Sequence, residues 1–178
     1  MSVVLLGYRG SGKTTVGKIV AKRLGVGLVD TDSLIVEAAG MPIREIFAAK
    51  GEGYFRDLEH EQLQRALAEG HAVISTGGGI VVREENRRLL RESGRFAVYL
   101  HGDVRTLHER ITGDANSHIS RPNLTNLGGG LEEIEYLLSI RDPLYREVAQ
   151  LVVETGGRRP EEIAQEILRG CRERGLGG

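Results

Sequence analysis

The segment from Gly7 to Thr14 has the residue types and spacing of a phosphate-binding loop. Its sequence, Gly-Tyr-Arg-Gly-Ser-Gly-Lys-Thr, matches the pattern G-x-x-x-x-G-K-[ST] at every fixed position. Glycines let backbone N–H groups wrap around an anion without hindrance from a Cβ atom. The Lys13 ammonium can reach the β- and γ-phosphates of a nucleoside triphosphate, and the Thr14 hydroxyl can bind Mg²⁺. The segment therefore predicts a site for a nucleoside triphosphate with Mg²⁺.

Two carboxylates, Asp30 and Asp32, come directly after an apolar segment, residues 28–29. Carboxylates beside a phosphate-binding loop can bind Mg²⁺ or accept a proton from a hydroxyl nucleophile. A helix that we expect to run to Ala39 begins at the same place, so Asp32 or Ser33 could instead be a plain N-cap. Two carboxylates so close together favour Mg²⁺ binding or proton transfer over a plain N-cap.

Three arginines and a run of glycines also suggest ligand binding, because guanidinium groups suit two-point contacts with carboxylate and phosphate. Arg56 could be oriented by Glu59, one turn later on a helix. The backbone of Gly77–Gly79 follows a buried strand and offers a surface against which a ligand can pack. Arg121 lies in an irregular segment, where it could close onto a transferring phosphate, and Arg141 lies in a helical segment. The alternatives are solvated surface charges and a simple glycine turn.

Short apolar segments alternate along the chain with segments of helical periodicity. We expect strands at residues 3–6, 28–30, 72–76, 96–100 and 151–153. We expect helices at residues 13–24, 32–39, 43–49, 52–69, 83–93, 104–111, 131–146 and 160–172, with a break at Pro143. This alternation predicts an α/β fold in which helices cover both faces of a parallel sheet. Ligands of such sheets bind beyond the carboxyl ends of the strands.

The segment 113–130 has no periodicity and is rich in Asp, Asn, Ser and Gly. Connections of this length within a compact domain are uncommon and often functional. We expect it to be a mobile lid.

Length and composition limit the classes of protein that this chain can represent. A chain of 178 residues with 40% hydrophobic and 28% charged residues predicts one folded domain, residues 1–178. The net charge of −1 provides no basic field for nucleic acid or an anionic membrane. No apolar run approaches a membrane span, and the first residues resemble a strand more than a signal peptide. The single cysteine, Cys171, excludes an internal disulfide, and we expect a cytoplasmic protein.

Taken together, these motifs resemble the shikimate kinase family over nearly the whole chain. The matching segments are residues 10–15, 28–32, 51–56 (Gly-Glu-Gly-Tyr-Phe-Arg), 77–79, 121–122 (Arg-Pro) and 141–145 (Arg-Asp-Pro-Leu-Tyr). The resemblance implies a monomeric enzyme that uses ATP and Mg²⁺ to phosphorylate the 3-hydroxyl of shikimate, on the pathway to chorismate and the aromatic amino acids. It also implies the three-layer fold of nucleoside monophosphate kinases, with a five-stranded parallel sheet in the order 2-3-1-4-5. Helices at about 32–69 would bind shikimate, and the lid would cover about 113–130.

The resemblance also implies roles for individual residues. Lys13, Asp32 and Arg121 would be catalytic, with Asp32 contacting the reacting hydroxyl, while Thr14 and Asp30 would hold Mg²⁺. The implied ATP-binding residues are Gly10, Ser11, Gly12, Lys13, Thr14, Thr15, Arg110, Arg121, Pro160 and either Arg158 or Arg159. The implied shikimate-binding residues are Asp32, Phe47, Phe55, Arg56, Gly78, Gly79 and Arg141, in which Arg56 and Arg141 grip the carboxylate.

Two other functions are compatible with a phosphate-binding loop. The first is another small-molecule kinase, such as a gluconate kinase or a nucleotide kinase, although the chain lacks the Asp-Gly-[Phe/Tyr]-Pro-Arg run of a nucleoside monophosphate kinase. The second is a GTP-dependent switch, which would need Asp-x-x-Gly and Asn-Lys-x-Asp motifs that the chain also lacks.

Overall fold

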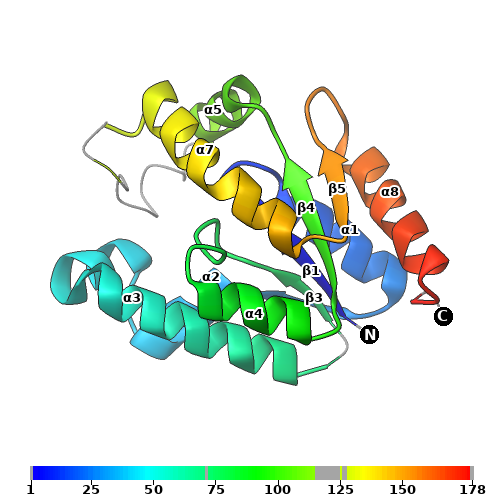
Figure 1. Cartoon of the computed structure of the whole chain (residues 1–178), viewed down its shortest axis with the longest axis horizontal. Coiled ribbons are helices and arrows are strands. Elements are labelled where there is room, and N and C mark those ends of the chain that lie inside the picture. Colours follow the sequence, from blue (N-terminus) through cyan, green and yellow to red (C-terminus); the bar gives the residue numbers. More distant parts are fainter. Residues whose placement is uncertain (1, 71, 115–124, 126–127, 177–178) are drawn as a thin grey trace.

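The computed structural model of the chain describes residues 2–70, 72–114, 125 and 128–176. Five parallel strands form one sheet in the order β2-β3-β1-β4-β5 (Figure 1). The strands are β1 (Ser2–Leu6), β2 (Gly27–Asp30), β3 (Ala72–Ser75), β4 (Phe96–His101) and β5 (Leu151–Glu154). The predicted fold class and strand order are therefore confirmed.

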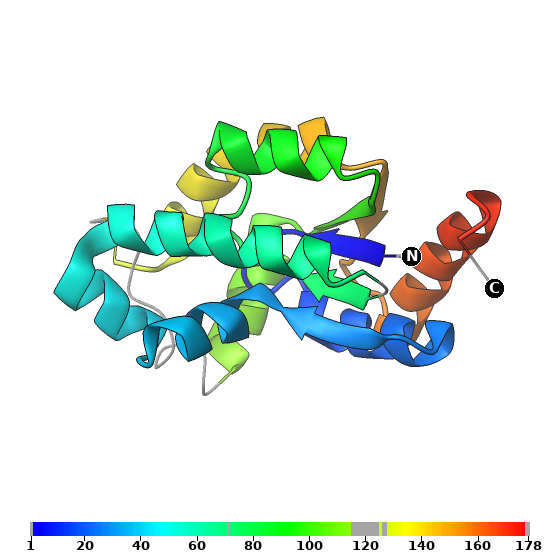
Figure 2. The same cartoon turned by 90° about the horizontal axis from the view of Figure 1, so that it is seen from below.

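The central strand β1 explains why helices must cover both faces of the sheet. All of its residues are buried, and alternate side chains point to opposite faces. Val3 and Leu5 pack in one apolar cluster with residues of α1 (Lys13–Leu24) and α8 (Pro160–Glu173). Val4 and Leu6 pack in a second cluster with residues of three helices, which are α3 (Ile43–Ala68), α4 (Glu84–Glu92) and α7 (Leu131–Val148). The result is the predicted three-layer arrangement, which Figure 2 shows from below, after a turn of 90° about the horizontal axis of Figure 1.

Two further helices lie at the carboxyl end of the sheet. α2 (Thr31–Ala39) packs on α3, and α5 (Val104–Gly113) packs on α7. α3 is broken at Gly51, where the backbone has φ 81° and ψ 173°, so the two helices predicted on either side of this residue are present. Most of the predicted lid, residues 115–124 and 126–127, lies outside the described residues.

The N-cap of α2 differs from the prediction. Asp30, and neither Asp32 nor Ser33, caps the helix: its Oδ1 accepts hydrogen bonds from the backbone N–H groups of Asp32 (3.0 Å) and Ser33 (3.3 Å). The helix begins one residue earlier than expected, at Thr31, because the carboxylate at the end of β2 already satisfies its first N–H groups.

The predicted helix break at Pro143 is also wrong, because α7 continues through this residue to Val148. An interior proline costs about 3 kcal/mol or more. Buried side chains on both sides of it, Leu138 and Tyr145, pack into the core, and the proline itself is exposed. Burial of one continuous helix face therefore outweighs the loss of one backbone hydrogen bond.

No helix in the described part of the chain is both long enough and apolar enough to cross a membrane.

Candidate active site

A cleft of about 850 Å³ opens beyond the carboxyl ends of the strands. The phosphate-binding loop, the ends of β2 and β3, and helices α2 and α5 contribute its walls. Its lining residues include Arg9, Gly10, Gly12, Lys13, Thr14, Thr15, Asp30, Asp32, Ser75, Thr76, Gly78 and Arg110. Residues from distant parts of the sequence thus meet at the edge of the sheet where ligands of parallel α/β folds bind.

The phosphate-binding loop joins β1 to α1 and is shaped by the Lys13 side chain. The Lys13 Nζ donates hydrogen bonds to the carbonyl oxygens of Gly7 (2.7 Å) and Tyr8 (2.9 Å). Gly12 precedes the helix with φ 93°, a conformation that favours glycine. The loop therefore brings the N-terminus of α1, with its positive dipole, to the cleft.

Three oxygen donors meet beside this loop. The Thr14 hydroxyl lies 3.3 Å from the Asp30 Oδ2 and 3.4 Å from the Ser75 Oγ. Hydroxyl and carboxylate oxygens are ligands that Mg²⁺ prefers, and Mg²⁺ in phosphotransferases needs only one or two protein ligands besides phosphate and water. Within the described residues, no group of three or more His, Cys, Asp or Glu side chains could hold a metal. Thr14 and Asp30 fit a metal that arrives with a nucleotide.

Asp32 lies in the cleft wall against the glycine segment. A Cβ atom at Gly77 would lie 2.8 Å from the Asp32 Oδ1 and 3.2 Å from the Glu59 Oε1. Because Gly77 has no Cβ atom, these two carboxylates can occupy the space beside it. Because Asp30 provides the N-cap, the Asp32 side chain is not needed for that purpose.

Arg56 lies on α3 and Arg141 on α7, and the positive charges of both influence the carboxyl group of Glu59. The Arg56 Nη1 donates to the Glu59 Oε2 at 2.8 Å, and both side chains are buried. Burial raises the pKa of Glu59 above its ordinary value, and the charges of Arg56 and Arg141 oppose that rise. Neither arginine lines the cleft, but the Arg56 guanidinium lies against Gly79. The Arg141 side chain is hydrogen-bonded to Tyr145, whose hydroxyl donates to the carbonyl of Gly78, a residue of the cleft lining.

The two phenylalanines lie beneath Arg56. Phe47 and Phe55 pack with their ring centroids 4.6 Å apart, and the Arg56 Cζ lies 5.3 Å from the centroid of the Phe55 ring. Phe55 is buried in the apolar cluster between α2 and α3, and neither ring lines the cleft. In this structure, the Phe55 ring contacts the arginine, and Phe47 packs against Phe55.

Only part of the implied ATP-binding set lines the cleft. Arg110 does, and it is fixed by hydrogen bonds from its Nη1 to the Gly10 carbonyl (3.3 Å) and from its Nη2 to the Thr155 carbonyl (2.8 Å). Arg158 forms an ion pair of 2.8 Å with Glu166 of α8. Ser11 is buried and does not line the cleft, and its Oγ accepts a hydrogen bond from the Lys13 Nζ at 3.4 Å. The remaining residues of the set are Arg159, which is the N-cap of α8, Pro160, which is its first residue, and Arg121, which lies outside the described residues.

Comparison with known proteins places the chain in a family. The family model described as "Shikimate kinase" matches residues 9–172. A shikimate kinase from Thermodesulfovibrio yellowstonii is 41% identical over 168 residues, which cover 94% of this chain and 93% of that protein. One from Symbiobacterium thermophilum is 40% identical over 178 residues and covers both chains completely. The chain belongs to the shikimate kinase family.

Solved structures agree with this membership. The structure of shikimate kinase from Acinetobacter baumannii in complex with shikimate has a TM-score of 0.89 and 34% identity, and covers 98% of this chain and 94% of that one. A gluconokinase from Sinorhizobium meliloti has a TM-score of 0.60 at 22% identity, which shows the shared fold alone. The predicted family and its kinase activity are therefore confirmed, and the gluconate-kinase alternative is less favoured.

Sequence reasoning missed two residues of this shikimate kinase family site. Ser75 approaches Thr14 from the end of β3, and Tyr145 donates a hydrogen bond to the Gly78 carbonyl from α7. The position of Ser75 at a strand end, next to Gly77–Gly79, is a signal that could have identified it. Tyr145 ends the matched segment 141–145, but nothing in that segment identifies its partner, which is 67 residues away.

Proposed function

We propose that this chain transfers the γ-phosphoryl group of ATP to the 3-hydroxyl of shikimate. One observation carries the proposal: the phosphate-binding loop, Asp32 and Gly78 line a single cleft in a chain of the shikimate kinase family. A shared cleft can hold the phosphate donor and the acceptor hydroxyl together. Shikimate-dependent formation of ADP tests this assignment.

Phosphoryl transfer requires positioning and charge neutralisation more than covalent chemistry by the protein. The Lys13 ammonium would neutralise charge on the β- and γ-phosphates from its place in the loop. Asp32 would orient the 3-hydroxyl and accept its proton while the oxygen–phosphorus bond forms and the bond to ADP breaks. Arg121, as a lid residue, would approach the same phosphates.

Thr14 and Asp30 would hold Mg²⁺ with the nucleotide, since both present oxygens beside the loop. Bound Mg²⁺ supplies neutralisation of phosphate charge. Arg110 would border the adenine together with Pro160 and either Arg158 or Arg159.

Arg56 and Arg141 would bind the shikimate carboxylate, and Gly78 and Gly79 would present backbone to the same molecule. Phe47 and Phe55 would shape this end of the site by supporting Arg56. A monomeric state, a cytoplasmic location and the lack of a nucleic-acid partner remain predictions.

Arg56→Ala and Arg141→Ala are each expected to raise the KM for shikimate by roughly tenfold to a hundredfold, because a hydrogen bond to a charged group is worth about 1.5–3 kcal/mol. The ammonium of lysine cannot make the planar two-point contact of a guanidinium, so rescue by lysine is only partial. The KM for ATP should change much less. Steady-state kinetics with each substrate varied in turn measures both values.

A shikimate analogue without the carboxylate is the control for this pair. Wild type and each arginine variant should use that analogue almost equally well. An equal loss toward shikimate and the analogue would show that the arginines do not recognise the carboxylate.

Gly79→Ala is expected to displace Arg56 while the fold survives. A Cβ atom at this position would lie only 2.2 Å from the Arg56 Nη1, which is the movable end of a long side chain. We expect a KM for shikimate about tenfold higher, near the lower end of the effect of losing the arginine contact. The thermal midpoint should also fall, because displacing the guanidinium weakens its buried ion pair with Glu59, and kinetics together with thermal denaturation measures the two effects separately.

Gly27→Ala provides the matched control, since no atom lies within 4 Å of its added Cβ. Its KM for shikimate should equal that of wild type. An unchanged KM in Gly79→Ala would separate Gly79 and Arg56 from shikimate binding.

A further inference from the structure

Tyr145 lies between Arg141 and the glycine segment, both of which the proposed function assigns to shikimate binding. It follows Arg141 by four residues on α7, so both side chains project from the same face of the helix. Its hydroxyl donates a hydrogen bond to the Gly78 carbonyl and is hydrogen-bonded by the Arg141 side chain. A phenol has one proton to donate, so the lone pairs of the hydroxyl accept from Arg141. One atom thus joins the guanidinium to the glycine segment.

The tyrosine ring is held rigidly. It is fully buried and stacks on Tyr99 of β4, with ring centroids 4.7 Å apart. Burial raises the pKa of the Tyr145 hydroxyl above its ordinary value, so the group remains a protonated donor at neutral pH. On its other side, Arg141 lies over the Tyr8 ring, with its Cζ 5.8 Å from the ring centroid. Arg141 is therefore fixed between the phosphate-binding loop and Tyr145.

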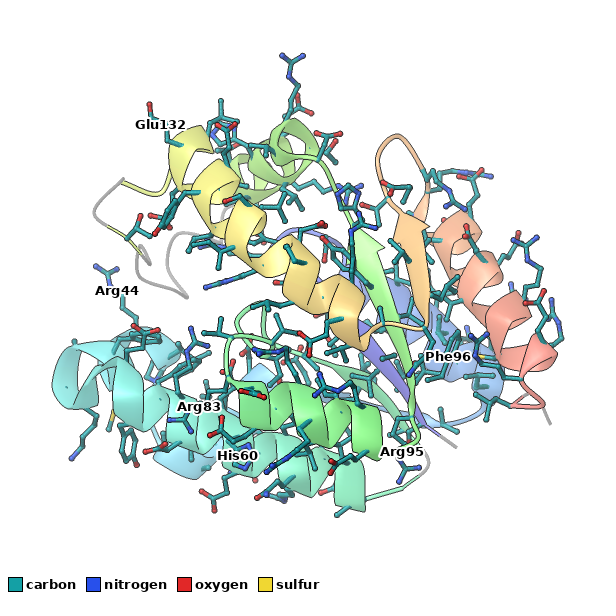
Figure 3. The ribbon with its side chains drawn as sticks, in the orientation of Figure 1. Arg44, His60, Arg83, Arg95, Phe96 and Glu132 are labelled. Carbon is teal, nitrogen blue, oxygen red and sulfur yellow. The ribbon has the colours of Figure 1, made fainter. Side chains whose placement is uncertain are left out.

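The glycine segment is held by hydrogen bonds to its carbonyl groups. Each carbonyl of residues 77–82 accepts one, and the donors come from the segment itself, α4 and α7. The carbonyls of residues 77–79 accept from the N–H of Ile80, the Tyr145 hydroxyl and the N–H of Val82, in that order. The carbonyl of residue 80 accepts from the Asn86 side chain, and those of residues 81 and 82 both accept from the Arg87 side chain. Asn86 is also bound by His60 of α3, at 2.6 Å, and Figure 3 shows His60 beside α4. Tyr145 supplies the one contact in this series that comes from the helix of Arg141.

The hydrogen bond to the Gly78 carbonyl also fixes the N–H of Gly79. The peptide between them is planar and trans, so its C=O and N–H groups point in opposite directions. The Gly79 N–H is therefore directed away from Tyr145. Among the described residues, none accepts a hydrogen bond from this N–H. Glycine on both sides of this peptide leaves its orientation free to change unless a partner holds it.

We propose that Tyr145 is a positioning residue whose hydroxyl sets both the Arg141 guanidinium and the Gly78–Gly79 peptide for the carboxylate-bearing acceptor. This inference rests on the proposed function. It predicts that loss of the hydroxyl weakens acceptor binding and leaves nucleotide binding intact, because the Lys13 ammonium is held by the carbonyl oxygens of Gly7 and Tyr8, whereas the Tyr145 hydroxyl donates its hydrogen bond to the Gly78 carbonyl.

Tyr145→Phe removes the hydroxyl and keeps the ring in its stack. We expect the KM for shikimate to rise about three- to tenfold, the effect of one lost hydrogen bond, and the KM for ATP to stay within about twofold. Tyr99→Phe is the matched control: it removes a hydroxyl from the same stack, one that donates to the Asp142 Oδ1 at 2.9 Å, and should leave both KM values within about twofold of wild type. A merely structural role would lower the thermal midpoint of both variants without raising KM, since KM does not depend on the folded fraction.

A double-mutant cycle tests whether Tyr145 acts through Arg141. The KM increase for shikimate in Tyr145→Phe/Arg141→Lys should be smaller than the product of the two single increases, because coupled residues are not additive. Multiplicative effects would overturn the proposal, as would an unchanged KM in Tyr145→Phe or an equal rise in Tyr99→Phe. A wild-type enzyme that does not phosphorylate shikimate would overturn the proposed function and this inference together, whereas an active wild type with an unaffected Tyr145→Phe would overturn this inference alone.

Discussion

Replacing Asp32 with Asn is expected to lower kcat by about 10²–10⁴-fold, the usual contribution of a general base, with a much smaller change in the KM for shikimate. Asn can hydrogen-bond a hydroxyl but cannot take its proton. The competing explanation, that Asp32 is only a helix cap, fails because Asp30 holds the first N–H groups of α2. The stability of Asp32→Asn should therefore be close to that of wild type, and steady-state kinetics with thermal denaturation measures both.

Glu37→Gln is the matched control for this substitution. Glu37 is a carboxylate on the same helix and also lines the cleft. Its loss should leave kcat within about twofold of wild type, as is usual for a substitution away from special contacts. A kcat for Asp32→Asn within about tenfold of wild type would contradict its role as proton acceptor.

Lys13→Met should reduce phosphoryl transfer by about 10²–10³-fold or more, because it removes a preorganised positive charge from the developing phosphate charge. The side chain is only 9% exposed, and its ammonium also holds the carbonyls of Gly7 and Tyr8. The substitution therefore affects the shape of the loop as well as its charge. Transfer is measured as ADP formation at saturating shikimate.

Two measurements separate these effects of Lys13. Shikimate binding to Lys13→Met, measured by calorimetry, should remain near the wild-type value if the acceptor side of the cleft is intact. Lys18→Met, an exposed lysine on the same helix, should behave as wild type. Transfer by Lys13→Met within about tenfold of wild type, roughly 1.4 kcal/mol in the barrier, would exclude a conventional phosphate-binding loop.

The sheet and most of the elements could be predicted from the sequence because their signals are local. Apolar runs such as residues 3–6 identify strands buried on both faces, and glycines mark the helix ends. The order of the strands came from resemblance to a family. Pro143 was misjudged because local propensity favours a break, while burial of Leu138 and Tyr145 on one helix face decides the structure.

The candidate site was predictable where one motif contains both the residue and its partner. Lys13 and Thr14 are examples, since the loop that they complete is contiguous. Asp30 was assigned only to Mg²⁺, although each of its two oxygens has its own contact, one with the N–H groups of α2 and one with Thr14. Ser75 and Tyr145 were missed because their partners lie 61 and 67 residues away and are brought together only by the fold.

The most direct test of the central claim is the acceptor specificity of ATP consumption. With saturating ATP and Mg²⁺, ADP formation is followed with shikimate, gluconate or CMP, and phosphorus NMR locates the phosphate on the product. A site built to hydrogen-bond one acceptor should favour shikimate by at least about 10²-fold in kcat/KM and place the phosphate on its 3-hydroxyl. A comparable or higher kcat/KM with gluconate or CMP, or ATP hydrolysis that shikimate does not accelerate, would contradict the proposed function.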